Sequence, residues 1–371
     1  MSKVSCEAAG KCRRRLCEWR GLNGYNLKKK GRVSMMQEAI QKVVDGHNLS
    51  QQEASQVMNL MLSGEATQAQ LGAFLAAMRM KGETLEELTG FASVLKEKAE
   101  HIAPDTRNYL DLVGTGGDRT FTFNISTTSA FVAAGAGLPI AKHGNRSISS
   151  KSGAGDVLEA LGVNITAEPE VVAKCVEKAG LGFMFAPSFN KSMKYVGQAR
   201  KEMGVRSVFN ILGPLANPSD AKSMVVGVYD PALTDLLARA MCNLGVESGF
   251  VVSGEDCMDE FTLTGKTIVS EINDGKVSTY EVTPEQFGFQ RATLADLQGG
   301  DGKDNARITE GILKGEVRGA KRDIVLLNAG AALYAGKVAG SMEDGISLAA
   351  EAIDSGKAFT VLEKLVELSN Q

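Results

Sequence analysis

Hydrophobic positions along the chain follow two different periods. Between residues 34 and 101 they recur at helical spacing, as in the apolar stripe formed by Leu88, Phe91, Leu95 and Ala99. From residue 109 onward, short apolar runs typical of buried strands alternate with helical patterns, and these runs lie at 109–113, 138–141, 163–165, 182–185, 224–228 and 250–253. This alternation predicts an α/β fold with a mostly parallel central sheet flanked by helices.

Polar residues divide the first part of the chain into short helices. Capping boxes, in which Ser or Thr is followed three residues later by Glu or Gln, begin at Ser50, Thr67 and Thr84. Glycines then stand where the preceding helices should end, at Gly64 and Gly82. We therefore expect a small N-terminal helical bundle at 34–103, followed by a large α/β domain at 104–371.

A hairpin is predicted late in the sheet. The apolar runs 268–272 and 277–282 flank Asn273-Asp274-Gly275, which is a strong signal for a tight turn between antiparallel strands. From Arg307 onward the pattern is mostly helical. The parallel sheet should therefore gain an antiparallel edge before the chain ends in helices.

Charge is distributed unevenly over the 371 residues. The net charge is −3, but residues 1–33 hold ten Lys and Arg against Glu7 and Glu18, which leaves −11 for the remainder. An acidic body argues against nucleic acid as the main partner. The basic segment contains no apolar run long enough for a signal peptide or a membrane span, so we expect no membrane partner.

Residues 1–33 are expected to be a basic, disordered extension. Their Arg-rich and acid-poor composition is also compatible with a transit peptide or a nucleic-acid-binding arm. Three of their residues, Cys6, Cys12 and Cys17, are spaced like a metal knuckle, but no fourth ligand is well placed. The remaining cysteines are scattered, which predicts reduced thiols and a cytoplasmic location; they are Cys175, Cys242 and Cys257.

Two loops rich in glycine and small polar residues follow the first two predicted strands. Gly114, Gly116 and Gly117 let the backbone approach a ligand closely, and a small-residue helix then opens at 124–128 with free N–H groups that suit a phosphate. The second loop, 142–147, is cationic and full of donors. Either loop alone is compatible with an ordinary turn, but the two together predict an anion site at the sheet edge. The pattern fits neither a P-loop nor a Rossmann fingerprint.

Two adjacent carboxylates, Asp259 and Glu260, follow the strand predicted at 250–253 and should lie at the same edge of the sheet. Mg²⁺ is typically shared between one or two carboxylates and substrate phosphates, so a carboxylate pair beside an anion site predicts magnesium binding. Lys142 would direct a point charge toward the same polyanion. Without the phosphate loops, a solvated acidic loop would be the simpler interpretation.

Six motifs occur in a fixed order along the chain: GTGGD at 114–118, NIST at 124–127, KHGNRS followed by SSKSG at 142–153, RKEMG at 200–204, FNILGPLANP at 209–218 and MDE at 258–260. In order and spacing the chain resembles the anthranilate phosphoribosyltransferases from about Met35 to the C-terminus. The resemblance implies transfer of phosphoribose from phosphoribosyl pyrophosphate to anthranilate, giving N-(5-phosphoribosyl)anthranilate and pyrophosphate in tryptophan biosynthesis. It also implies Mg²⁺ as cofactor and a homodimer formed through the helical bundle.

The resemblance also implies roles for individual residues. Phosphoribosyl pyrophosphate would be bound by Gly114, Gly117, Asp118, Thr122, Asn124, Ile125, Ser126, Thr127, Lys142, His143, Gly144, Asn145, Arg146, Ser147, Ile148, Ser149, Ser150 and Ala154. Anthranilate would be bound by Gly114, Asn145 and Arg200, and Mg²⁺ by Ser126, Asp259 and Glu260. No covalent nucleophile is expected, because the protein's contribution should lie in holding and neutralising the leaving pyrophosphate.

One position departs from the pattern of the family. Asn190 stands where many members carry a histidine before proline, and this leaves its contact with the acceptor open. Arg200 suits a planar carboxylate, because its guanidinium can bind it with two hydrogen bonds, although a surface helix arginine is the simpler interpretation from sequence alone.

Two other functions are weighed against this one. A nucleoside phosphorylase-like enzyme of the same fold handles free phosphate and needs neither a carboxylate-reading arginine nor an Asp-Glu metal pair. A non-enzymatic relative that binds nucleic acid would need a basic body, whereas the body here is acidic. The motifs therefore favour the transferase.

Overall fold

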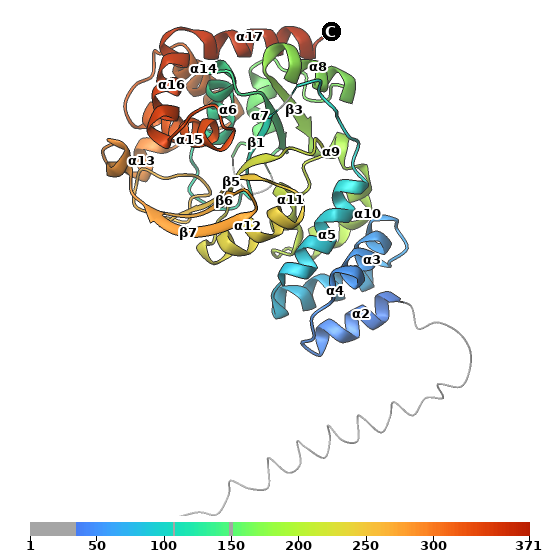
Figure 1. Cartoon of the computed structure of the whole chain (residues 1–371). Coiled ribbons are helices and arrows are strands. Elements are labelled where there is room, and N and C mark those ends of the chain that lie inside the picture. Colours follow the sequence, from blue (N-terminus) through green and yellow to red (C-terminus); the bar gives the residue numbers. More distant parts are fainter. Residues whose placement is uncertain (1–34, 107, 148–150) are drawn as a thin grey trace, which may run out of the picture.

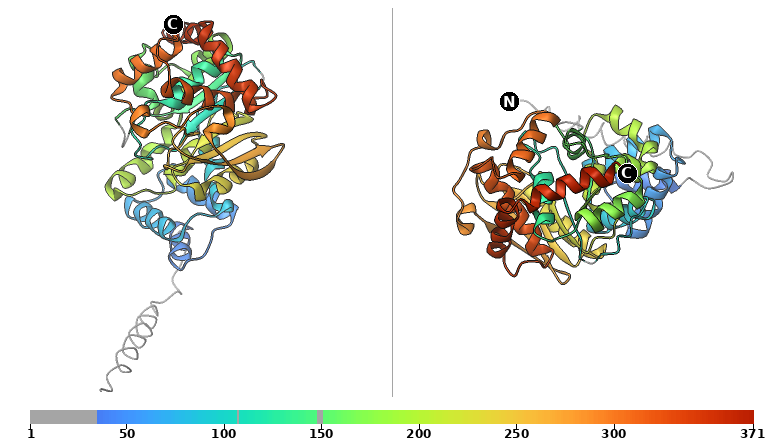
Figure 2. Two further views of the ribbon diagram at one scale, coloured as in Figure 1. Left: turned by 90° about the vertical axis from the view of Figure 1, so that its left-hand side faces the viewer. Right: turned by 90° about the horizontal axis from the view of Figure 1, so that it is seen from above.

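The computed structural model describes residues 35–106, 108–147 and 151–371 (Figure 1). The expected extension at 1–33 lies outside the described residues. Within them, a group of short helices at the N-terminal end adjoins a larger α/β body. Figure 2 shows these helices at one end of the molecule and the C-terminal helices at the other.

A seven-stranded sheet forms the centre of the α/β body, in the order β3-β2-β1-β4-β5-β6-β7. The first five of these strands in space run parallel, and β6 and β7 are antiparallel, as the sequence predicts. The strands are β1 (Leu110–Gly114), β2 (Ile140–Gly144), β3 (Leu181–Phe185), β4 (Ser223–Gly227), β5 (Ser248–Gly254), β6 (Thr267–Asn273) and β7 (Lys276–Val282).

The predicted hairpin joins β6 to β7. Asp274 and Gly275 both have positive φ angles, 46° and 76°, which is the conformation of a tight turn matched to the twist of the flanking strands. The hairpin therefore forms the antiparallel edge of the sheet, as expected.

The prediction of a strand at 163–165 is wrong. These residues form the turn between α7 (Ala154–Ala160) and α8 (Pro169–Ala179), and the Val163 N–H donates to the Leu158 carbonyl at the end of α7. Val163 and Ile165 are nevertheless buried in the core beside the sheet. A short apolar run thus marked burial correctly but not the backbone conformation.

The N-terminal helices are α2 (Met35–Val44), α3 (Gln51–Leu62), α4 (Gln68–Lys81) and α5 (Leu85–Glu97). All three predicted capping boxes are present, at Ser50, Thr67 and Thr84. Gly64 and Gly82 follow α3 and α4 with positive φ angles, which ends those helices where the sequence predicts.

Two hydrophobic cores cover the two faces of the sheet. One joins β1 and β5 to α6 (Ile125–Gly135) and the C-terminal helices. The other joins the opposite face to α2–α5 and to α10 (Lys194–Met203), α11 (Phe209–Leu215) and α12 (Thr234–Asn243). Within β4, Val225 faces the first core and its neighbours Met224 and Val226 face the second, as strand geometry requires. The N-terminal helices therefore share a continuous core with the sheet.

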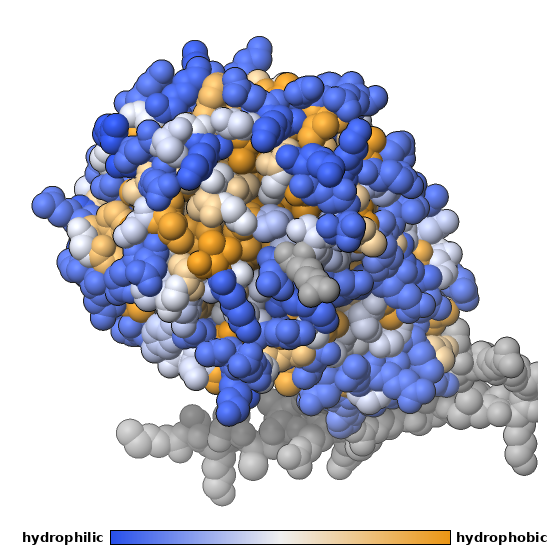
Figure 3. Space-filling view, turned by 45° about the horizontal axis from the view of Figure 1, so that its top comes forward, coloured by the Kyte–Doolittle hydropathy of each residue, from blue (hydrophilic) through white to orange (hydrophobic). Residues whose placement is uncertain are grey.

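The remaining helices are α9 (Ala186–Phe189), α13 (Leu294–Leu297), α14 (Gly302–Leu313), α15 (Ala320–Ala335), α16 (Met342–Asp354) and α17 (Lys357–Ser369). Polar and charged side chains dominate the face shown in Figure 3, with smaller apolar patches between them. Among the described helices, none combines the length and apolar character needed to cross a bilayer.

A buried carboxylate ties the capping of α5 to the rest of the N-terminal helices. Glu87 is fully buried and accepts hydrogen bonds from the N–H groups of Thr84 and Leu49 and from the ammonium of Lys81, at 2.8–2.9 Å. Glu53 occupies the equivalent capping position of α3, but its side chain is 43% exposed. The same local motif thus has very different surroundings in the two helices.

We predict that Glu87→Ala lowers the free energy of unfolding by about 3 kcal/mol, because it removes the carboxylate that pairs with the largely buried ammonium of Lys81 and leaves the Leu49 N–H without its acceptor. Glu53→Ala should cost only about 1 kcal/mol, as expected for an exposed cap. Urea unfolding of both variants measures the difference. Equal losses would show that burial adds nothing to the capping box of α5.

Candidate functional site

The loop after β1 is held against the Asp259 carboxylate. The Gly116 N–H donates to Asp259 Oδ2 at 2.7 Å, and the Thr115 N–H donates to the Gly227 carbonyl at the end of β4. A Cβ at Gly114 would overlap the Asp259 carboxylate, and one at Gly227 would overlap the Asp259 backbone. Only glycine fits at these two strand ends, since Asp259 packs directly on both.

The N-terminus of α6 is capped from a distant part of the chain. The Ser126 N–H donates to Glu260 Oε1 at 3.1 Å, so a carboxylate satisfies one of the free donors of the helix. The capping residue, Asn124, does not bond its own helix through its side chain. Its amide instead accepts from Ser152 Oγ and from Asn305 Nδ2, which links α6 to the second loop and to α14.

Asp259 and Glu260 thus hold two successive parts of the chain after β1: Asp259 binds the loop itself, and Glu260 binds the N-terminus of α6. The juxtaposition expected from the sequence is present. This arrangement brings several carboxylates close together. Burial and then the Asp118 carboxylate raise the pKa of Asp259 to about 7. Burial and then Asp259 raise the pKa of Glu260 well above its usual value. The cluster is therefore an electrostatically costly site that a cation would stabilise.

The sequence predicts Lys142 in an open loop, and this prediction is wrong. Lys142 lies in β2, beneath the carboxylate cluster. Strand β2 continues through Lys142 and His143 to Gly144, because its pairing with β3 extends that far. The Lys142 side chain is 1% exposed, and its ammonium donates to the Leu112 carbonyl and to Ser126 Oγ. Burial lowers the pKa of Lys142, and the nearby carboxylates oppose that shift.

A buried aspartate below the site was missed by the sequence analysis. Asp111 lies in β1, is fully buried, and accepts from the His143 N–H at 3.1 Å and from Asn217 Nδ2 at 2.6 Å. Burial raises the pKa of Asp111 to about 6, and the charge of Lys142 opposes the shift. A carboxylate inside the apolar run YLDLV was the available signal, because a charged residue in a buried strand needs specific partners.

His143 is held as a neutral side chain. Burial lowers the pKa of His143 to about 4. Its Nε2 lies 3.3 Å from Asn190 Nδ2, so the position that departs from the family pattern contacts the histidine of the predicted site. Asn190 Oδ1 is buried and has no hydrogen-bond partner among the described residues.

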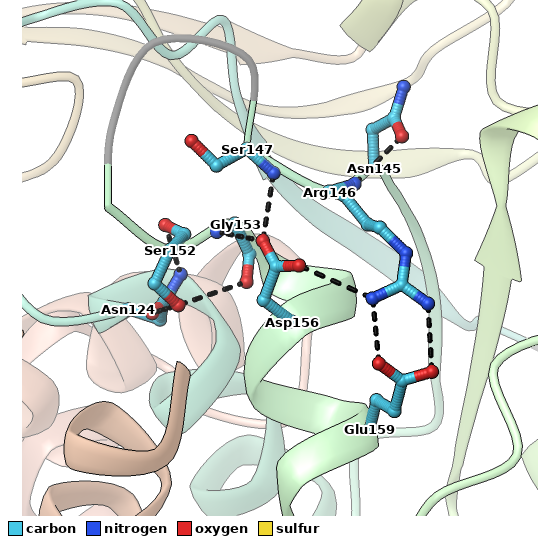
Figure 4. Close-up of polar contacts among 8 residues, drawn as sticks. All are labelled: Asn124, Asn145, Arg146, Ser147, Ser152, Gly153, Asp156 and Glu159. Carbon is cyan, nitrogen blue, oxygen red and sulfur yellow. Dashed lines mark hydrogen bonds and ion pairs between the residues drawn. The ribbon is translucent and has the colours of Figure 1, made fainter. Parts of the chain in front are cut away.

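The second loop is folded around Asp156, as Figure 4 shows. The Asp156 carboxylate accepts hydrogen bonds from the N–H groups of Ser147 and Gly153 at 2.9 and 2.8 Å, and from Arg146 Nη1 at 3.3 Å. Arg146 also binds Glu159 through two hydrogen bonds, so its guanidinium is engaged within the loop and α7. Asn145 is exposed, and its side chain accepts from the Arg146 N–H.

The other predicted residues of the phosphate site lie around these two loops. Gly117, Asp118 and Thr122 belong to the loop after β1, Ile125 and Thr127 to the first turn of α6, and Gly144 and Ala154 to the ends of β2 and α7. Thr127 Oγ1 and Thr115 Oγ1 are buried hydroxyls without partners among the described residues. Three further predicted residues, Ile148, Ser149 and Ser150, lie outside the described part of the chain.

Arg200 presents a desolvated guanidinium. It lies on α10 with its Cζ 5.0 Å from the centre of the Phe209 ring, and burial lowers its pKa. No carboxylate among the described residues pairs with it. An anionic group of a ligand would fit this position, and the planar guanidinium of Arg200 matches a carboxylate.

The donor set at the sheet edge suits Mg²⁺. Two carboxylates and the Ser126 hydroxyl supply hard oxygen ligands, which is the chemistry that magnesium prefers. Within the described residues, no group of three or more His, Cys, Asp or Glu forms a complete metal cage. An ion held here would therefore need oxygens from a substrate, such as phosphates.

Comparison with known proteins agrees with this geometry. Residues 37–99 match the helical bundle domain of a glycosyl transferase family, and residues 106–359 match the α/β domain of the same family. The chain is thus a member of this glycosyl transferase family, made of these two parts.

The similarity extends over the whole length of individual relatives. The chain is 54% identical to the anthranilate phosphoribosyltransferase of Acetivibrio thermocellus over 336 residues, 91% of this chain and 97% of the relative. It is 51% identical to that of Methanocorpusculum labreanum, over 90% of this chain and 98% of the relative. The chain belongs to the family of anthranilate phosphoribosyltransferases.

Solved structures of the family have the same fold. The enzyme of Thermus thermophilus superposes with a TM-score of 0.86 at 40% identity, over 90% of this chain and 99% of that one. The enzyme of Saccharomyces cerevisiae, in complex with phosphoribosyl pyrophosphate and Mg, superposes with a TM-score of 0.84 at 29% identity. The superposition covers 91% of this chain and 99% of that one.

We predict that His143 makes the protein less stable in acid. Its pKa is lowered from 6.5 to about 4 on folding, so its contribution to stability is fully present above pH 6.5 and is lost as the pH falls toward 4. Between pH 7.5 and pH 5.0 this loss amounts to about 2 kcal/mol. In His143→Gln the drop in unfolding free energy between these two pH values should be smaller by that amount.

Urea unfolding at the two pH values measures the drop in each protein. The matched control is His47→Gln, since His47 is exposed, and it should keep the wild-type drop. An unchanged drop in His143→Gln would show that the imidazole is charged in the folded protein.

Proposed function

We propose that the protein transfers the phosphoribosyl group of phosphoribosyl pyrophosphate to the amine of anthranilate and releases pyrophosphate, the phosphoribosylation step of tryptophan biosynthesis. The observation that carries the proposal is the position of Asp259 and Glu260, which bind the loop after β1 and the N-terminus of α6 respectively. Relatives over the whole chain carry the name of this activity. The yeast enzyme has been solved with phosphoribosyl pyrophosphate and Mg, and also with 4-fluoroanthranilate.

The phosphate loops would bind the donor substrate. The loop after β1, the first turn of α6 and the second loop follow strand ends of a parallel sheet, which is where such sheets bind ligands. The buried hydroxyls of Thr115 and Thr127, which have no partner among the described residues, would be further donors there. We assign to this site the eighteen residues named for it in the sequence analysis. Arg146 would act by shaping the second loop, because its side chain is engaged by Glu159 and its N–H by Asn145.

Ser126, Asp259 and Glu260 would hold Mg²⁺. When bound, the ion supplies positive charge to the pyrophosphate as it leaves. Burial and then neighbouring carboxylates raise the pKa of Asp259 and of Glu260, and a cation bound to both would oppose these shifts. Lys142 lies close enough to both to offset part of their charge from below.

The acceptor would be held by Arg200, Asn145 and Gly114. Arg200 has no anionic partner among the described residues and lies on the ring of Phe209, so it can bind the anthranilate carboxylate with two hydrogen bonds. The aromatic amine is already neutral at pH 7, and His143 is neutral too. Positioning the amine at C1 of the ribose, without a strong base, is then sufficient.

The two other functions have less support. A phosphorylase-like enzyme would need neither the Asp259–Glu260 pair nor an arginine that binds a carboxylate, the role we assign to Arg200. A nucleic-acid-binding relative would need a basic body, and the chain outside residues 1–33 carries −11.

The family resemblance also supports a homodimer formed through the helical bundle. Met80 on α4 and Val44 on α2 are the most exposed large hydrophobic side chains among the described residues, at 89% and 62%. These two helices pack on each other, so a second copy of the chain could cover both side chains. We assign the bundle to 34–103 and the catalytic body to 104–371. We place the enzyme in the cytoplasm, in keeping with the free thiols of Cys175, Cys242 and Cys257.

A steady-state assay that follows the loss of anthranilate fluorescence with phosphoribosyl pyrophosphate and Mg²⁺ tests the proposal. In this assay Arg200→Lys should raise the KM for anthranilate about tenfold or more, because lysine keeps the charge but loses the planar fork. The KM for phosphoribosyl pyrophosphate should stay nearly constant.

Lys201→Ala is the matched control for this variant, since Lys201 is an exposed neighbour on the same helix, and it should leave both KM values unchanged. Equal effects of Arg200→Lys on both substrates would remove Arg200 from the acceptor site. Absence of turnover with anthranilate in the wild type would overturn the proposed function.

A further inference from the structure

Arg206 connects three separate segments near the site. It lies between α10, which carries Arg200, and α11. Its Nη2 donates to the Gly117 carbonyl in the loop after β1, and its guanidinium carbon lies 3.9 Å from the centre of the Tyr229 ring, which follows β4. It forms no ion pair within the described part of the chain. An arginine that stacks on a ring and donates to one carbonyl is held in a defined orientation.

The bond to Gly117 fixes the direction of a neighbouring amide. The peptide unit between Gly117 and Asp118 is planar and trans, so its N–H points opposite to its carbonyl. When Arg206 binds the Gly117 carbonyl, the Asp118 N–H is therefore directed away from the arginine. That N–H has no acceptor among the described residues, and it belongs to the loop that also donates to Asp259 through Gly116.

Two side chains from different parts of the chain thus hold consecutive residues of one loop. Asp259 accepts from the Gly116 N–H, and Arg206 donates to the Gly117 carbonyl. Both glycines have positive φ angles, 66° and 76°, and glycine alone adopts this region without strain, so the backbone here has little conformational preference of its own. External contacts must therefore set the conformation of this loop.

We propose that Arg206 is a positioning residue that couples the acceptor segment to the phosphoribosyl loop. It holds the Gly117–Asp118 peptide in the orientation that binds phosphate, and it does so from the connection that directly follows the Arg200 helix. A displacement of α10 or of the loop is transmitted to the other through this one side chain. The inference rests on the proposed function, because it assigns the two substrates to these two segments.

Substitution of Arg206 should therefore affect both substrates, unlike substitution of Arg200. Arg206→Lys keeps the charge but loses the fork and the stacked plane. It should lower kcat/KM for phosphoribosyl pyrophosphate and for anthranilate about tenfold each. The matched control is Arg239→Lys on α12, where the arginine is exposed and pairs with Asp235; it should leave both values unchanged.

Tyr229 gives an independent perturbation of the same contact. Tyr229→Leu removes the ring face under the guanidinium and should shift both kcat/KM values in the same direction as Arg206→Lys. Tyr229→Phe keeps the face and should behave as the wild type. A Tyr229→Phe variant as impaired as Tyr229→Leu would contradict the stacking part of the proposal.

The coupling itself is measured by a double-mutant cycle of Arg200→Lys and Arg206→Lys. If the two residues act as one segment, their effects on kcat/KM for anthranilate should be less than multiplicative. Multiplicative effects, or an Arg206→Lys variant that melts earlier but keeps wild-type KM and kcat, would overturn the proposal.

Calorimetric binding of phosphoribosyl pyrophosphate with Mg²⁺ separates this inference from the proposed function. Arg206→Lys should weaken that binding about tenfold in the absence of any acceptor, and Arg200→Lys should not. This result would stand even if anthranilate were not the acceptor. Unchanged binding in Arg206→Lys would overturn the positioning role by itself.

Discussion

The structure depends on a pair of adjacent carboxylates that are held close together at the edge of a parallel sheet. Asp259 accepts a hydrogen bond from the loop after β1 and Glu260 accepts one from the N-terminus of α6, so one dipeptide joins two elements to which we assign phosphate binding. Burial raises the pKa of both carboxylates, with the charge of Asp118 adding to the shift of Asp259 and the charge of Asp259 to that of Glu260. Such a cluster stays ionised only with positive charge close by, and this is what the rest of the site must supply.

The ammonium of Lys142 supplies positive charge to the carboxylate pair, and glycines at two strand ends leave room for Asp259. The buried ammonium of Lys142 lies under the pair and is itself balanced by Asp111 in the neighbouring strand. Gly114 and Gly227 end β1 and β4 without side chains, which lets Asp259 pack on both. Among the described residues, the carboxylates at this edge outnumber the ammonium of Lys142. In the proposed function, a divalent cation shared with the pyrophosphate would complete the balance and couple metal binding to donor binding.

Local chemistry predicted much of this from the sequence. Capping boxes, the Asp274-Gly275 turn and the alternation of apolar runs depend on neighbouring residues alone, and the structure confirms them. The prediction of a strand at 163–165 is wrong because an apolar turn buried in the core has the same composition as a short buried strand. Lys142 was expected in a loop because strand pairing, which extends β2, is not visible in a single segment. The contact of Arg206 with Gly117 joins positions far apart in sequence, so no local pattern indicates it.

The central claim is that the carboxylate pair holds Mg²⁺ for the leaving pyrophosphate, and a Mg²⁺ titration of activity in the double variant Asp259→Asn/Glu260→Gln tests it most directly. The account predicts that kcat/KM falls by on the order of a hundredfold, roughly 3 kcal/mol, and that half-maximal activity requires more Mg²⁺. Circular dichroism should show a folded protein. Glu343→Gln/Asp344→Asn, an exposed acidic pair on α16, should keep wild-type behaviour. A folded site variant with wild-type rate and wild-type Mg²⁺ dependence would contradict the account.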